Sequence, residues 1–180
     1  NYFGFFIVVI AIQCFGLSEP TAVMLLTTQG LVFVGSLFSM GSFAEWLGYF
    51  KFYLTGLSLI GSGLLLLALS SISFWLWPAS LMLGLGLGML HIANFMSFAK
   101  VGEQTEMAKV SPILALVGPI GGLLGGFLGA AFGASIGLQN LFLPIGLAFL
   151  ALILCLFKDQ VFQQFLAQKP EQHVVEGQQS

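Results

Sequence analysis

The chain has 180 residues, of which 58% are hydrophobic and only 7% charged, and its mean hydropathy is +1.01. A water-soluble domain carries about a quarter charged residues, so this composition predicts an integral membrane protein. With five basic and seven acidic residues and a formal net charge of -2, the chain has no basic surface for nucleic acid, and we expect no nucleic-acid partner.

Six apolar runs follow one another along the chain. A helix that crosses the hydrocarbon layer needs about 20 apolar residues. The polar and charged interruptions divide the sequence into runs at 2–17, 22–44, 50–70, 74–98, 108–134 and 139–157. The predicted fold is therefore all-α, a polytopic bundle of six membrane-spanning helices over residues 1–157.

The start of the chain and the two cysteines fit this division. "LSEPT" predicts a helix start, with Ser18 as the cap and Pro20 in the first turn, where its missing N–H costs little. Cys14 and Cys155 each lie inside an apolar run, which predicts two buried small hydrophobic side chains rather than a disulfide. The first run is short and opens at Asn1, so we expect the chain to be a piece of a longer protein.

The lysines report the orientation of the bundle. Lys51 follows the second run, Lys100 and Lys109 lie between the fourth and fifth, and Lys158 and Lys169 follow the sixth. With six crossings, all five lysines fall on one side of the membrane. The positive-inside tendency makes that side cytoplasmic, in a cell or inner membrane, and places the carboxyl terminus there.

The composition changes at the end of the sixth run. Residues 158–180 are polar and rich in Gln, and they are predicted to form a cytoplasmic tail that is partly disordered. Residues 159–168 fit a short interfacial helix with four apolar side chains, namely Val161, Phe162, Phe165 and Leu166. Disorder is expected after Pro170.

The fifth run carries two rows of glycines on one side of the predicted helix. In lipid, close approach across small residues holds helices together, so this face is predicted to press on a neighbour. Static packing and a smooth surface for a sliding or rocking partner both fit, and "LGLGLG" with Gly84 and Gly88 is the expected partner. Pro119 predicts a kink. The packing residues are Gly118, Pro119, Gly121, Gly122, Gly125, Gly126, Gly129 and Gly133.

Polar side chains inside the runs are candidates for lining a solute cavity, because they are costly in contact with lipid. His91 fits either a proton carrier or, as we favour, a neutral residue hydrogen-bonding between helices. Gln139 and Asn140 sit at a run boundary, where helix capping explains them. No run holds an embedded carboxylate. The cavity candidates are Gln13, Gln29, His91 and Asn94.

The sequence contains no motif for catalysis or for a metal. It lacks a Cys/His cluster with metal spacing, an H-E-x-x-H, a G-x-S-x-G and a phosphate loop. "GLGLGML" echoes a nucleotide fingerprint, but no strand is predicted before it. We therefore expect neither an enzyme nor a bound cofactor or metal.

"GSFAEWLGYFK", residues 41–51, places Gly41, Glu45, Gly48 and Lys51 between the second and third runs. This segment resembles the loop of the major facilitator superfamily that reads G-x-x-x-D-x-x-G-R-[RK]. Glu45 replaces the usual Asp, Lys51 is displaced, and Tyr49 and Phe50 occupy the basic positions. "VGPIGG" in the fifth run resembles the superfamily's fifth-helix signature G-P-x-x-G-G.

The loop residues also have a physical reading. Gly41 permits a close helix crossing and Gly48 a tight turn, while Glu45 beside a helix end or a lysine would tie two helices in one conformational state. The alternative is that Glu45 and Lys51 are solvated loop charges. Both readings stay open.

The resemblance implies two six-helix halves around a central cavity, with this chain supplying one half, which we expect to be the second. The implied function is secondary transport of a small solute by alternating access, with membrane lipid and the other half as partners. An alternative is a non-transporting scaffold or assembly subunit whose glycine face binds partner helices, pigment or lipid. A central face filled by some of the 19 phenylalanines would favour that alternative.

Overall fold

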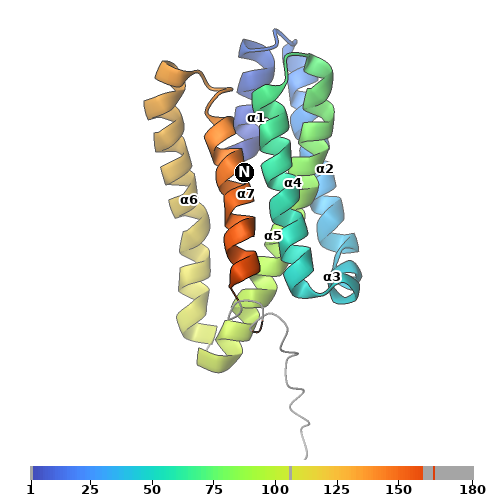
Figure 1. Ribbon diagram of the computed structural model, residues 1–180, viewed down its shortest axis with the longest axis vertical. Helices are drawn as coiled ribbons and strands as arrows, with labels where there is room; N and C mark the ends of the chain where they lie inside the picture. Colours follow the sequence, from blue (N-terminus) through green and yellow to red (C-terminus); the bar gives the residue numbers. More distant parts are fainter. Residues whose placement is uncertain (1, 106, 160–163, 165–180) are drawn as a thin grey trace, which may run out of the picture.

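The computed structural model describes residues 2–105, 107–159 and 164, and within them it contains α-helices, one 3-10 turn and no strand (Figure 1). The predicted all-α class is confirmed. The elements are α1 (Tyr2–Gln13), α2 (Glu19–Ser39), α3 (Gly41–Leu47), α4 (Tyr49–Leu69), η1 (Ser73–Trp75), α5 (Leu76–Thr105), α6 (Met107–Ile136) and α7 (Phe142–Lys158).

Each predicted apolar run overlaps one helix of 12 to 30 residues, and the second run also overlaps the short helix α3. The chain bends after α2, and α3 occupies residues that were expected to end the second run or form a loop. Three segments are long and apolar enough to cross a membrane, namely Glu19–Ser39, Tyr49–Leu69 and Ser73–Gly102. Gly118–Gly133 within α6 and the helix Phe142–Lys158 are shorter apolar segments.

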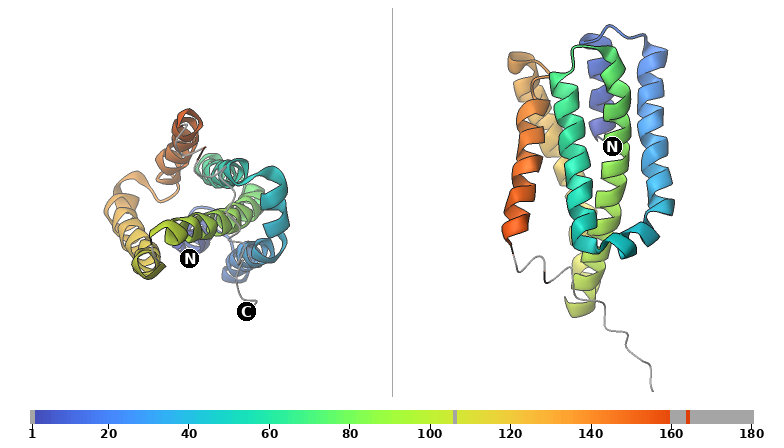
Figure 2. Two further views of the ribbon diagram at one scale, coloured as in Figure 1. Left: turned by 90° about the horizontal axis from the view of Figure 1, so that it is seen from below. Right: turned by 45° about the vertical axis from the view of Figure 1, so that its right-hand side comes forward.

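Helix α5 is the central helix of the bundle. It packs against α2, α4 and α6, while α7 packs against α4 and α1 packs against α2 (Figure 2). A core of aliphatic side chains joins α1, α2, α4 and α5, with Phe142 added from α7. Figure 2 shows α6 standing at the edge of the bundle, and its main contacts are to α5, with fewer to α1.

Glycines allow α5 to approach its neighbours closely. A Cβ atom at Gly84 would lie 2.6 Å from the backbone oxygen of Gln29, and one at Gly86 would lie 2.9 Å from the backbone oxygen of Gly56. A Cβ atom at Gly88 would overlap the hydroxyl of Ser36. The predicted contact of Gly84 and Gly88 with the fifth run is therefore wrong, because both glycines pack against α2 instead.

Local expectations at the helix ends and cysteines are met only in part. Helix α2 begins after Ser18 with Pro20 in its first turn, but Ser18 makes no side-chain cap bond and instead shares a 2.9 Å hydrogen bond with the hydroxyl of Thr21. Cys14 and Cys155 are free and exposed, so the prediction that they are buried is wrong. Their runs are apolar all round, and a helix of that kind gives no signal for which face is covered.

The lysine-bearing helix ends lie together. Lys51 is in the first turn of α4, Lys100 is near the end of α5, and Lys158 is the last residue of α7. Figure 1 shows these three helix ends at the lower end of the bundle, with the start of α6, which carries Lys109. Most of the predicted tail, including Lys169 and nearly all of the predicted interfacial helix, lies outside the described residues.

Candidate functional site

One face of α5 is left uncovered. Leu81, His91, Asn94 and Phe95 are exposed, whereas the glycines at 84, 86 and 88 are buried against α2 and α4. At 100° per residue the four exposed side chains fall in one stripe along the helix. We call these four residues the α5 stripe. It is polar at His91 and Asn94, in the part of α5 before Lys100, where the other side chains are apolar or small.

His91 and Asn94 are therefore brought together by the fold. The His91 ring lies edge-on to the ring of Phe33 from α2, with centroids 6.0 Å apart and an interplanar angle of 70°. Within residues 2–105 and 107–159, neither side chain has a hydrogen-bond partner. Among these described residues His91 makes no hydrogen bond between helices, so that role stays a prediction, and its polar edges are available on the α5 stripe.

Gln29 and Gln13 lie apart from that stripe. Gln29 is fully buried in α2, at the level where Gly84 meets its backbone, and both polar atoms of its amide lack a hydrogen-bond partner in the described chain. Gln13 is exposed at the last residue of α1, at the opposite end of the bundle from the lysines. The four predicted cavity residues therefore do not form one cluster.

The motif segment at the lysine end is held by apolar packing. Ala44 of α3 is buried in a small core with Phe52, Met89 and Ala93. Gly48 adopts a φ of +83°, a left-handed value that favours glycine, so the predicted tight turn is present. Glu45 and Lys51 are exposed, and no ion pair joins them in the described structure.

A lysine from another helix lies beside the motif position at which this chain lacks a basic residue. The ammonium group of Lys100, from the end of α5, lies 5.5 Å from the centroid of the Tyr49 ring at the start of α4. Tyr49 stands where the superfamily loop has a basic residue. Sequence reasoning missed this pair, although an aromatic residue at a basic position and a lysine at the same membrane boundary were its signals.

Gln139 and Asn140 cap helices, as predicted from their place at a run boundary. The Gln139 amide donates hydrogen bonds to the backbone oxygens of Leu67 at 3.0 Å and Ser70 at 2.7 Å, both at the end of α4. The Asn140 amide donates to the backbone oxygen of Ile136 at 3.0 Å. Gln139 therefore ties the α6–α7 connection to α4, a long-range contact that the sequence does not reveal.

The glycine face of α6 is only partly open: Gly122 and Gly129 are buried, and a Cβ atom at Gly133 would lie 2.9 Å from a side-chain carbon of Leu138. Cβ atoms built at Gly118, Gly121, Gly125 and Gly126 meet no atom within 4 Å. The helix runs unbroken through Pro112 and Pro119. The face that was expected to press on a neighbour has no neighbour among the described residues at these positions, and it remains a proposed packing face.

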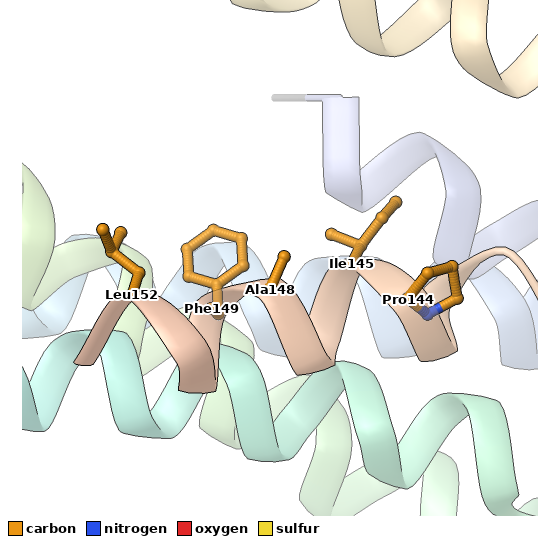
Figure 3. A pocket seen from close by; sticks show the side chains of 5 residues that line it. All are labelled: Pro144, Ile145, Ala148, Phe149 and Leu152. Carbon is orange, nitrogen blue, oxygen red and sulfur yellow. The ribbon is translucent and has the colours of Figure 1, made fainter. Parts of the chain in front are cut away.

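A groove on α7 has a different chemistry. It holds a cavity of about 360 Å³ lined by apolar side chains that project from one side of the helix (Figure 3), namely Pro144, Ile145, Ala148, Phe149 and Leu152. A solute with hydrogen-bonding groups finds no partner there. Among the described residues no three His, Cys, Asp or Glu side chains gather to hold a metal ion.

Long apolar helices, small-residue packing and lysines at one end define an integral membrane protein of the polytopic α-helical class. A family model described as Major Facilitator Superfamily matches residues 1–175. The chain belongs to this superfamily, which is one of membrane transporters, and 180 residues fit one half of its architecture. Neither the curated proteins nor the solved structures give a match.

Proposed function

We propose that this chain is one six-helix half of a secondary transporter that moves a small solute by alternating access. The observation that carries the proposal is the α5 stripe, where His91 and Asn94 are exposed and have no partner among the described residues. Polar groups at membrane depth face a protein interior or a water-filled cavity, because contact with lipid is costly. A second half placed over the α5 stripe would enclose both side chains.

The solute that fits this surface carries hydrogen-bonding groups. Asn94 offers an amide donor and acceptor, and His91 offers a ring nitrogen of each kind when neutral. The aromatic ring of Phe33 beside His91 adds an apolar wall. Since no apolar run holds a carboxylate, any coupling cation would depend on groups outside these runs or on His91.

The six crossings and the cytoplasmic carboxyl terminus belong to the same proposal. The lysine-bearing helix ends at one end of the bundle support them. Helices α1 and α7 have 12 and 17 residues, fewer than the about 20 that cross the hydrocarbon layer. They fit this topology if they cross only part of the membrane or if neighbouring residues complete the crossing.

Water accessibility of the α5 stripe tests the proposal in the full-length protein. With Cys14 and Cys155 replaced by Ser, Asn94→Cys should react with a membrane-impermeant maleimide. Leu154→Cys is the matched control, because Leu154 is 67% exposed on the apolar outer side of α7 and should stay unreactive in lipid. Equal lack of reaction at both positions would contradict a water-filled pathway and favour a scaffold.

Alternating access adds a second requirement. Glu45→Gln should change the ratio of Asn94→Cys labelling from the two faces of the membrane if α3 biases one state. An unchanged ratio would remove the motif segment from the mechanism, while leaving the accessible stripe as evidence for a pathway.

A further inference from the structure

The lysine ends of α4 and α7 are joined by an aromatic pair. The rings of Phe50 and Phe157 meet edge to face, with centroids 6.0 Å apart and an interplanar angle of 89°. The next residue in each helix is a lysine, Lys51 in the first turn of α4 and Lys158 in the last turn of α7. Both lysine side chains are exposed.

Each lysine stands at the end of the least buried stripe of its helix, which is exposed on α7 and half-buried on α4, where Leu66 packs against the core. Lys158 lies on the same side of α7 as Leu143, Leu147 and Leu154, which are exposed. Lys51 begins the least buried stripe of α4, which continues through five residues, namely Thr55, Ser58, Ser62, Leu66 and Leu69. These positions recur every three or four residues, so each set lies on one side of its helix.

Both stripes lie on the same side of the α4–α7 pair. The contact between the helices is made through Gly61 with Leu150 and through Leu65 with Gly146. Helix α4 leaves the lysine end and α7 returns to it, so the helices are antiparallel (Figure 1). At 100° per residue, each stripe lies roughly a quarter turn around its own helix from the residues that contact the other helix, in the same rotational sense along the chain. Because the two helices run in opposite directions, these equal rotations bring both stripes to the same side of the helix pair.

The charge at this place is positive. Within the described chain neither Lys51 nor Lys158 forms an ion pair. The acidic groups near them in sequence are Asp159, which directly follows Lys158, and Glu45 on α3, and both are exposed. Lys51, Lys100 and Lys158 against Glu45 and Asp159 leave one net positive charge at the boundary where an apolar surface ends.

We propose that Lys51 and Lys158 bind the phosphate of an anionic membrane phospholipid, with an acyl chain lying along the outer stripe of α7. The distance from Leu143 to Lys158 is about 22 Å along a helix. This exceeds the thickness of one leaflet, which is about half of a hydrocarbon core about 30 Å thick. Ammonium groups at the boundary attract anionic headgroups, and the leucines supply apolar surface that a free phosphate ion cannot use. The site uses no residue of the α5 stripe, although Lys51 also belongs to the motif segment 41–51.

Native mass spectrometry of the full-length protein tests the site. The protein is mixed with equal amounts of phosphatidylglycerol and phosphatidylcholine, and the ratio of the two bound lipids is measured. A lysine near an anionic surface contributes about fivefold to binding, so Lys51→Gln and Lys158→Gln should each lower the ratio about fivefold and the double variant about 25-fold. Lys51→Arg with Lys158→Arg should keep the preference.

Lys100→Gln is the matched control, because Lys100 lies at the same end but over Tyr49. It should leave the lipid ratio unchanged, and added inorganic phosphate should not displace the lipid. The proposal is overturned if the double Gln variant retains the preference while remaining folded by circular dichroism, or if Lys100→Gln lowers the ratio as much. Displacement by phosphate alone would show a simple anion site without an acyl component.

Discussion

The ammonium group of Lys100 lies over the ring of Tyr49, 5.5 Å from its centroid. The pair joins the end of α5 to the start of α4 at the lysine end of the bundle. Tyr49 takes a position that is basic in the superfamily loop, so the positive charge is present at this place but comes from another helix. The segment that precedes Tyr49 is positioned by the buried Ala44 and the left-handed Gly48.

Replacing Tyr49 measures this contact. Tyr49→Leu removes the ring face and should lower the free energy of unfolding by about 0.5–1 kcal/mol, whereas Tyr49→Phe keeps the face and most of the stability. The thermal midpoint of the full-length protein in detergent reports the change. In a Lys100→Met background, Tyr49→Leu should have a smaller effect, and fully additive effects would show that the two groups do not interact.

Gln139 is expected to stabilise the end opposite the lysines. Gln139→Ala leaves the backbone oxygens of Leu67 and Ser70 without their side-chain donor, which should cost about 1–2 kcal/mol. Asn140→Ala is the comparison, because its bond is local and exposed and its loss should stay within about 0.5 kcal/mol. Equal midpoints for the two variants would refute the tie between the α6–α7 connection and α4.

Substitution of the α5 glycines tests the central packing. A methyl group at Gly84 meets backbone, which cannot move away as a flexible side chain can, and Gly84→Ala should destabilise the fold by about 2–3 kcal/mol. Gly30→Ala is the control on α2, since a Cβ atom there meets nothing within 4 Å. Folded yield and thermal midpoint should fall for Gly84→Ala alone. A normal yield of that variant would mean that α2 and α5 are farther apart.

The buried amide of Gln29 has a predicted cost. Gln29→Leu removes two polar atoms that have no partner in the described chain and should raise the free energy of unfolding by about 1–3 kcal/mol. The readout is again the thermal midpoint, with Gln13→Leu as a comparison at an exposed position. A lower midpoint for Gln29→Leu would show that the amide is bonded, for example to a buried water.

The helical architecture was predictable because all the apolar runs except the short first one are long, and they end at charged or turn-forming residues. The short helix α3 was not, since Gly41–Leu47 is too brief to show a periodic pattern and depends on Ala44 fitting against Phe52. Glycine spacing predicted close helix contact but not the partner. Gly84 and Gly88 contact α2, and the same spacing fitted α6 equally well from sequence alone.

The candidate site was predictable only as a set of residue types. Polar residues in apolar runs were expected to line a cavity, yet the direction in which each points depends on helix rotation about its axis. His91 and Asn94 lie on one exposed stripe, whereas Gln29 is buried in the α2–α5 contact and Gln13 lies at a helix end. Apolar residues are distributed nearly evenly around each helix, so the sequence does not indicate how the helix is rotated about its axis.

The sidedness of the lysines is the most direct test of the whole account. With Cys14 and Cys155 replaced by Ser, single cysteines are placed at positions 51, 100 and 71 of the full-length protein, the last in the connection between α4 and η1. Each is labelled with an impermeant maleimide in sealed vesicles of known orientation. The account predicts that positions 51 and 100 label from the same face and position 71 from the other; labelling of 51 and 100 from opposite faces would contradict it.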